Sequence, residues 1–495
     1  MSAKQKKNAG NQRSFLKNIA RQAMMEHGLL PDFSPEVFKE LNNIGKPSDL
    51  TDKPEKDLRK LLWCSIDNDD SLDLDQLTVA ETTPEGITKF YVAIADVSLL
   101  VKKDSAIDNH ARQNTTSVYT DAEIFPMLPQ QLSNDLTSLN YEQDRSAIVV
   151  EMIIDADGRV KSSYIYRALV RNHAKLAYDS VAAWLEGKGP MPEALAKVQT
   201  LDANIKLQDQ IAQTLRKHRY EVGALNFETI HARSIFVGDI IKSLEADSKN
   251  RAKQLIEDFM IAANGATVQY LKSKKLPSFR RVVRSPERWE RIVDVVSSEY
   301  NHKLPSTPDA KALAIFLFDQ KKIDPVGFPD LSLTIIKLIG KGEYIVEFEG
   351  EKEVGHFGLA VRDYTHSTAP NRRYPDLITQ RILKAALKGA PSPYKPQELT
   401  ALAHLCTEKE DDATKVERRV AKSAAALLLS SRVGQKFDAI CTGAADKGTW
   451  VRIFDPPVEG KLIRGSKGVD VGSRLRVKLM RTNVKQGYID FEQVN

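Results

Sequence analysis

The stretch from Cys64 to Gln76 holds the residues of this chain that are best suited to chemistry. Five aspartates fall within nine positions: Asp67, Asp69, Asp70, Asp73 and Asp75. Like charges at this spacing repel one another, and burial would cost each of them its hydration. The stretch is therefore either a solvated acidic loop or a site for a cation.

The spacing excludes an EF-hand calcium loop. Leu72 occupies the position that needs a glycine, and Thr78 occupies the position that needs a bidentate glutamate. Oxygen ligands alone still suit a hard cation such as magnesium or manganese. Magnesium takes few protein carboxylates and completes its shell with water and substrate phosphates.

The pattern around the aspartates predicts an irregular loop that runs into a strand. In an extended chain Asp73 and Asp75 would share one face, with leucines on the other. Leu77 then falls on the parity of the aspartates, so the alternation breaks at Gln76.

Composition and charge bound the class of protein. The chain has 495 residues, 42% of them hydrophobic, which predicts a globular protein of about two to four domains. The net charge of +6 permits a nucleic-acid partner without indicating one. Three widely spaced cysteines form neither a disulfide frame nor a zinc pattern, so a reducing, cytoplasmic location is expected. No apolar run reaches the length of a membrane span, so no membrane partner is expected.

Residues 1–60 predict a basic tail, a small helical region and a linker. Residues 1–25 contain six basic residues and no acid, which favours a disordered tail and leaves an organelle transit peptide as the alternative. Apolar residues between 14 and 41 predict two short helices on either side of Pro31, and residues 45–60 predict a polar linker.

Residues 61–175 predict a mixed α/β unit. Strands are expected at 90–97, 147–154 and 160–170. Helices are expected at about 176–185, 202–221, 247–273 and 396–433, with residues 176–275 mostly helical. Two prolines within residues 124–129 exclude a central strand there.

Two arginine-rich segments leave two interpretations open. Residues 272–291 place five arginines near Phe279 and Trp289, as either a solvated face or a phosphate-attracting surface. Arg372 and Arg373 immediately precede a predicted helix. Their guanidiniums and the free N–H groups of the helix end suit a phosphate, and a structural salt bridge is the alternative.

After Gly434 the pattern changes to short alternating strands separated by glycines. Strands are expected at residues 437–441, 450–454, 474–480 and 488–492. This predicts a five-stranded OB-type barrel of about 60 residues. Four of its side chains would offer stacking and charge to single-stranded nucleic acid: Trp450, Arg452, Phe454 and Lys461.

Taken in order, these segments resemble the ribonuclease II/R (RNB) family of exoribonucleases over about residues 61–495. The resemblance is carried by Ser65-Ile66-Asp67 through Asp75, Tyr91-Val92-Ala93-Ile94-Ala95-Asp96, Phe125-Pro126-Met127-Leu128-Pro129, Lys175-Leu176-Ala177-Tyr178-Asp179, Met260-Ile261-Ala262-Ala263-Asn264, Gly355-His356-Phe357-Gly358-Leu359 and Pro370 to Tyr374. It implies an α+β fold class, with an RNB-type catalytic α/β domain at 61–433 and an S1-type OB barrel at 434–495. It also implies a narrow basic channel where single-stranded RNA enters 3′ end first and is degraded 3′ to 5′ to mononucleotides.

The resemblance implies roles for individual residues. The catalytic positions are Asp67, Asp73, Asp75 and Arg372, where the arginine clamps the scissile phosphate. The implied cofactor is Mg²⁺, with Mn²⁺ possible, at Asp67, Asp73, Asp75 and Gln76. The implied RNA contacts are Tyr119 and Phe227 for base stacking, Tyr178 and Glu257 for ribose selection, and Glu417 and Arg418 for the 3′ end. Taken alone, an aromatic such as Tyr119 or Phe227 would fit a core, and Glu417 would fit a helix surface.

Two features depart from the family pattern. The family usually has two N-terminal cold-shock domains, whereas about 60 residues precede the catalytic segment here, so RNA capture is expected to differ. A helix-turn-helix-like domain is one possibility. Gln76 replaces the last motif aspartate, and its carbonyl can ligate a metal but brings no charge. The sequence thus predicts a magnesium-dependent 3′-to-5′ exoribonuclease. The alternative is a protein of the same family that binds RNA but does not hydrolyse it.

Overall fold

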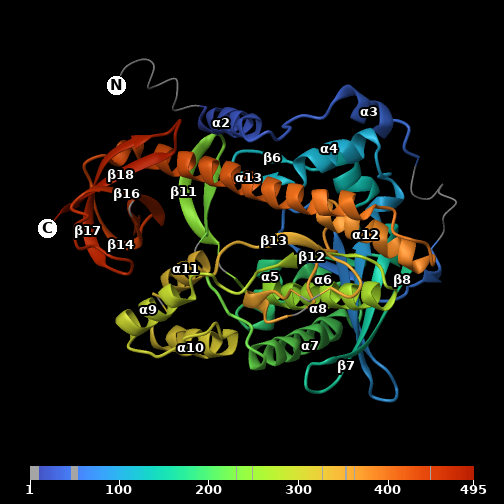
Figure 1. The fold of residues 1–495 in the computed structure, drawn as a ribbon. Coiled ribbons are helices and arrows are strands. Elements are labelled where there is room, and N and C mark those ends of the chain that lie inside the picture. Colours follow the sequence, from blue (N-terminus) through green and yellow to red (C-terminus); the bar gives the residue numbers. More distant parts are fainter. Residues whose placement is uncertain are drawn as a thin grey trace.

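The largest sheet of the described residues is a seven-stranded mixed sheet, and its strands β7 (Asp144–Ile154) and β8 (Val160–Arg171) lie at the lower right of Figure 1. The computed structural model describes residues 11–45, 54–229, 231–247, 249–325, 327–351, 354–361, 363–445 and 447–494. In spatial order the strands are β1 Lys56–Asp57, β8 Val160–Arg171, β7 Asp144–Ile154, β4 Thr88–Ala95, β3 Gln76–Thr82, β2 Cys64–Asp67 and β9 Ala174–Ala177. Both edge strands pair in parallel and the inner strands antiparallel. The strand expected near 90–97 and the expected hairpin are confirmed, and β1 lies where a linker was predicted.

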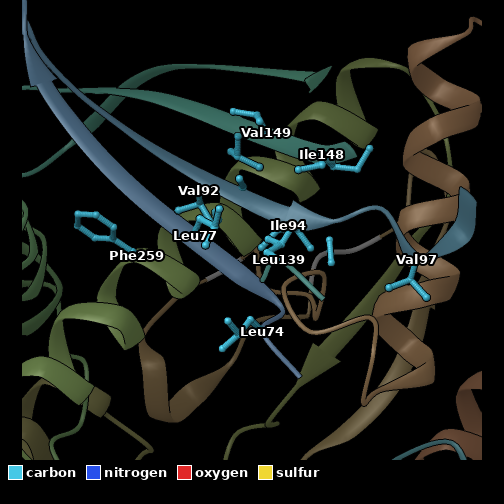
Figure 2. Packing of buried hydrophobic residues seen from close by; sticks show 14 of the residues in the cluster. Leu74, Leu77, Val92, Ile94, Val97, Leu139, Ile148, Val149 and Phe259 are labelled. Carbon is cyan, nitrogen blue, oxygen red and sulfur yellow. The ribbon is translucent and has the colours of Figure 1, made fainter. Parts of the chain in front are cut away.

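Helices cover the face of the sheet that bears Thr78 and Phe90. They are α5 Tyr178–Leu185, α6 Glu193–Ala196, α7 Leu201–Glu221 and α8 Arg251–Ser273. Thr78 Oγ1 donates to Gln208 Oε1 of α7 at 2.7 Å, and the Phe90 ring lies 4.7 Å from that of Phe259 of α8. Figure 2 shows Phe259 beside the apolar side chains of the sheet. The sheet is covered on both faces, so β4 is almost continuously buried rather than alternating.

Two further helices carry the C-terminal half of the RNB-like unit. They are α12 Tyr374–Leu387, the helix predicted after Arg373, and α13 Pro396–Leu429, close to its predicted bounds. In Figure 1, α13 runs along the upper part of the molecule from α12 to the barrel. Its last, apolar turns enter the barrel core through Ala426 and Leu429. Shorter elements complete this unit: η2 Val97–Leu99, α4 Ala106–Asn114, β5 Val118–Tyr119, β6 Ile124–Phe125, η3 Gln131–Leu136 and η4 Phe357–Leu359.

The region 176–275 is mostly helical as predicted, and between α7 and α8 it contains a hairpin for which no strands were predicted. The hairpin pairs β10 His231–Val237 with β11 Ile240–Asp247. Its turn places Gly238 at φ +60°, a conformation that glycine adopts without strain. A two-residue glycine turn between β-branched residues was the available signal.

The arginine-rich segment 272–291 is structural only in part, because Arg280 is buried in ion pairs whereas Arg284, Arg288 and Arg291 are exposed. It contains β12 Ser278–Val282, which pairs with β13 Glu343–Glu347, and the start of a layer formed by α9 Trp289–Tyr300, α10 Ala310–Ile323 and α11 Phe328–Ile339. Arg280 is fully buried and forms ion pairs with Glu347 at 2.9 Å and Asp363 at 3.2 Å. Arg280 therefore belongs neither to a solvated face nor to a phosphate-attracting surface. Phe279 and Trp289 are core residues.

The C-terminal strands close into the predicted five-stranded barrel. They are β14 Lys436–Ala445, β15 Gly448–Ile453, β16 Val458–Arg464, β17 Arg474–Asn483 and β18 Tyr488–Val494, and η5 Ser430–Arg432 joins them to α13. Arg452, expected to face nucleic acid, is only 8% exposed and pairs with Asp330 of α11 at 2.6 Å. This ion pair docks the barrel on the helical layer and corrects the expectation for Arg452.

The N-terminal helices are α2 Gln12–Glu26 and α3 Pro35–Leu41, as predicted on either side of Pro31. They pack on the body of the protein: α2 lies on α13, and α3 contributes Val37 and Leu41 to the main core. Residues 1–10 of the predicted tail and residues 46–53 of the predicted linker lie outside the described residues, and α2 shows that the tail prediction was wrong for residues 12–25. Within the described part of the chain, no helix combines the length and apolar character needed to cross a membrane.

Candidate active site

The acidic stretch is an irregular loop between β2 and β3, as predicted. β2 ends at Asp67 and β3 begins at Gln76. Leu74 anchors the loop: its N–H donates to Ser138 Oγ at 3.0 Å and its carbonyl accepts from Leu139 N at 3.0 Å. Figure 2 shows Leu74 and Leu139 among the packed apolar side chains. Leu74, buried between two aspartates, fixes their backbone.

Asp75 and Arg372 form the centre of the site. Asp75, 2% exposed, accepts the Asn371 N–H at 3.0 Å and faces Arg372 Nε at 3.2 Å. Burial raises the pKa of Asp75 to about 7, against the opposing effect of the Arg372 charge. The Arg372 side chain is 41% exposed, so part of its guanidinium faces solvent. The site therefore combines a buried carboxylate with a cation that can reach an incoming anion.

The two arginines before α12 have different roles. Arg373 pairs with Asp376 at 2.7 Å, and Asp376 also accepts the Ala369 N–H at 2.8 Å. Arg373 therefore forms a structural salt bridge, which was the alternative to a phosphate contact for this arginine pair. The carbonyl of Arg372 accepts from Ser117 N at 2.9 Å. Backbone contacts on both sides hold the turn that presents the Arg372 guanidinium.

Asp67, Asp73 and Tyr119 lie close enough to influence one another. Tyr119 Oη donates to Asp73 Oδ2 at 3.2 Å. Burial raises the pKa of Asp73, and the negative charge of Asp67 adds to the increase. Burial also raises the pKa of Tyr178, with a further contribution from Asp67. A cation between Asp67 and Asp73 would relieve the repulsion between these carboxylates.

Asp67 and Asp73 are the candidate carboxylates for a metal ion in this loop. Among the described residues, no three His, Cys, Asp or Glu side chains converge to hold a metal ion. Asp67 and Asp73 fit a hard cation that takes few protein oxygens and completes its shell with water and phosphate. Their oxygen-only chemistry suits magnesium and also manganese.

Gln76 occupies a different face of the sheet from Asp75. Gln76 pairs with Ile94, and Thr78, two residues further along the strand, pairs with Val92. Residues two apart on a strand share a face, so Gln76 lies on the face that α7 and α8 cover. The ladder continues one residue further, because Ala95 N donates to the Asp75 carbonyl at 3.0 Å. The Asp75 side chain therefore points to the opposite face of the sheet from Gln76. Gln76 is buried, with 8% exposure, on the side away from the Asp75 carboxylate.

Two residues with implied RNA contacts lie in a separate pocket. Phe227 and Glu257 line a cavity of about 270 Å³ with Arg216, Arg219 and His356. Glu257 of α8 also forms an ion pair with Lys249. Phe227 packs against the apolar cluster of α9, α10 and α11. Tyr178, by contrast, lies near the aspartates.

The late helix contributes a contact that was not anticipated. Glu417 accepts the backbone N–H of Tyr119 at 2.9 Å, and burial raises the pKa of Glu417. Arg418 is exposed on α13. On the barrel, Trp450 is half-buried, with Lys461 Nζ 5.9 Å from its ring centroid, and Phe454 is exposed.

Sequence reasoning missed the residues that act through their backbone or a small hydroxyl. Asn371 N–H holds Asp75, and Ser138 Oγ holds Leu74. Asn371 lies within the recognised motif from Pro370 to Tyr374, which was the available signal. Ser138 had no local signal, because its role depends on a contact 64 residues away in the chain.

The matches to family models define the class of protein. The RNB domain model matches residues 55–389, and the RNase II-type exonuclease C-terminal S1 domain model matches residues 435–494. The chain therefore belongs to the RNB family, with an α+β fold and a C-terminal S1-type barrel.

Named relatives and solved structures agree with this family. Ribonuclease R of Vibrio parahaemolyticus is 30% identical over 513 residues, covering 95% of this chain and 60% of that protein. The chain thus spans less than two thirds of the length of this relative. The apo form of Mycoplasma genitalium RNase R matches with a TM-score of 0.87 at 24% identity, covering 97% of this chain and 78% of that one. Yeast Ssd1, described as a pseudonuclease, has a TM-score of 0.70 at 16% identity, with coverages of 90% and 55%.

Proposed function

We propose that this protein is a metal-dependent 3′-to-5′ exoribonuclease that hydrolyses single-stranded RNA to nucleoside 5′-monophosphates. The observation that carries the proposal is the junction of Asp75, Arg372 and the Asp67–Asp73 pair at one end of the sheet. Relatives named Ribonuclease R support it, as do complexes of Mycoplasma genitalium RNase R with ribose-methylated single-stranded RNA and with double-stranded RNA.

The chain's own groups can perform three tasks. Arg372 would bind the scissile phosphate and stabilise the charge that builds up on it during attack. Asp75 would orient the attacking water and accept its proton, since a base with a pKa near the operating pH is efficient. Tyr119, 41% exposed and bonded to Asp73, would stack on the terminal base and hold the last linkage in register.

Asp67 and Asp73 would hold the metal ion, with Mg²⁺ proposed and Mn²⁺ as the second choice. When bound, this ion would supply charge neutralisation at the phosphate and a more acidic water. The proposed location is the cytoplasm.

One assay tests the proposed function. Purified protein is incubated with 5′-labelled and 3′-labelled oligo-RNA, with and without magnesium. The expected result is a shortening ladder from the 5′ label and immediate release of labelled mononucleotide from the 3′ label, only with metal. Binding without degradation would instead identify the rival, an RNA-binding protein that retains the channel, which the pseudonuclease fold of Ssd1 illustrates.

Gln76→Asp is expected to leave the magnesium dependence almost unchanged. The strand register directs this side chain away from Asp75, so a carboxylate there would not join the metal ligands. We expect the magnesium concentration for half-maximal activity to stay within about twofold of the native value, whereas Asp73→Asn should raise it. A clear shift to lower magnesium in Gln76→Asp would instead identify Gln76 as a metal ligand.

Glu257→Ala is expected to weaken discrimination against a 2′-deoxy nucleotide near the 3′ end. A 2′-hydroxyl can donate to a carboxylate, and a 2′-deoxy sugar cannot. Rates on matched substrates with one deoxy substitution give the ratio for each variant. Lys249→Ala is the control, because it breaks the same ion pair but leaves the carboxylate. An unchanged ratio in Glu257→Ala would reject Glu257 as a ribose reader.

A further inference from the structure

The hairpin that carries Tyr119 is too short to hold its own shape. β5 and β6 contribute two residue pairs, Val118 with Phe125 and Tyr119 with Ile124. Within the turn, Thr120 Oγ1 donates to the Glu123 carbonyl at 2.6 Å. Isolated two-stranded hairpins are at best marginally stable in water, even when they are longer than this one. The position of Tyr119 must therefore be set by the elements packed around residues 118–125.

Helix α2 supplies the apolar backing of this hairpin. Val118, Ala122 and Phe125 are buried in one cluster with side chains of α2 and α13. The α2 members are Leu16, Ile19, Ala20, Ala23 and Met24. This cluster is separate from the core of the sheet. The rear of the Tyr119 hairpin thus rests on the N-terminal helix and α13.

Polar contacts fix the register of α2 against the hairpin. Arg13 Nε donates to the Ala122 carbonyl at 3.4 Å, and Arg21 lies 3.7 Å from the Glu123 carboxylate. Gln12 Oε1 accepts the Ile241 N–H at 2.9 Å, which ties the start of α2 to β11.

Two further contacts hold the hairpin from other directions. Ser234 Oγ of β10 donates to Asp121 Oδ2 at 2.6 Å, and Glu417 of α13 accepts the Tyr119 N–H. The Tyr119 hydroxyl then bonds Asp73 of the acidic loop. A shift of α2 would therefore move the hairpin and change where the Tyr119 ring lies relative to the aspartates.

We propose that α2 positions Tyr119 for the 3′ end of the RNA, so that the N-terminal helix supports turnover without touching the substrate. This inference rests on the proposed function. Leu16, fully buried in the cluster, is the positioning residue at its centre. The N-terminal region would thereby serve the active site from behind the Tyr119 hairpin.

The test compares Leu16→Ala with Met25→Ala in the full-length protein. Met25 lies on the same helix but is 61% exposed, so its truncation leaves the cluster intact. Leu16→Ala should increase amide hydrogen exchange in residues 117–126 and leave strands β7 and β8 unchanged. It should lower kcat for nucleotide release by roughly tenfold, since small misplacements of positioning groups have effects of this order. Leu16→Met, of similar volume, should recover most of the rate.

A double-mutant comparison separates positioning from general destabilisation. In the Tyr119→Ala background, Leu16→Ala should cause little further loss, because the group that it positions is already absent. An equal loss in both backgrounds would overturn the proposal, and so would unchanged exchange in residues 117–126. Ile19→Val, a smaller truncation in the same cluster, replaces Leu16→Ala if that variant does not fold. The exchange measurement needs no RNA, so it tests the role of α2 even if the protein proves to have no exoribonuclease activity.

Discussion

Asp75→Asn is expected to lower the rate of nucleotide release by about 10³-fold or more. Asparagine keeps the shape of the side chain and can still accept the Asn371 N–H. It cannot accept a proton from water, and it no longer balances the Arg372 charge. The affinity for single-stranded RNA should stay within about threefold, because most of that affinity comes from phosphate contacts and stacking elsewhere. Single-turnover kinetics and equilibrium binding give the two values.

The matched control is Asp69→Asn. Asp69 lies in the same loop and loses the same charge, but its side chain is exposed. This variant should degrade RNA at close to the native rate. A native rate in Asp75→Asn would show that the Asp75 carboxylate is not needed for turnover. An equal loss in both variants would show that only the general negative charge of the loop matters.

Arg372→Lys is expected to lower the rate of the chemical step by about 10² to 10³-fold, although it conserves the charge. Lysine is a flexible point charge, whereas the planar guanidinium can face Asp75 with one N–H and a phosphate with the others. The loss should appear mainly in kcat, because lysine stabilises the charge of the transition state less well than arginine does.

Arg159→Lys is the control for this substitution, since Arg159 lies in the exposed turn between β7 and β8. Both variants should have native unfolding temperatures. A native kcat in Arg372→Lys would mean that any cation suffices at this position. It would contradict the proposed role of the Arg372 guanidinium in binding the scissile phosphate.

Local sequence determined the elements and most of the residues that can do chemistry. Alternating and helical periodicities predicted β4, the β7–β8 hairpin, α7, α8, α13 and a closed five-stranded barrel. The density of aspartates between β2 and β3 indicated a functional loop, because a fold has few other uses for such a cluster. These features depend on residues that are close to one another in the chain, so they could be predicted from the sequence.

Charge alone could not separate structural arginines from functional ones. Arg280 and Arg452 lie in stretches that suggested phosphate or RNA, and both are buried in ion pairs with acids from distant segments. Arg373 and Arg372 are adjacent, yet one is bound to Asp376 and the other faces Asp75. Which acid meets which arginine depends on long-range packing, and burial of a paired charge leaves no mark on the local pattern.

The tertiary structure also decided the orientation of Gln76 and the role of the N-terminus. Register in the β3–β4 ladder places Gln76 on the face that α7 and α8 cover and Asp75 on the other face, and a shift of one residue would exchange the two. Helix α2 was predictable from its apolar spacing, but its partners are the Tyr119 hairpin and α13, more than 90 residues away in sequence. A helix's own periodicity shows that it has an apolar face, whereas the surface which that face covers is set by the fold as a whole.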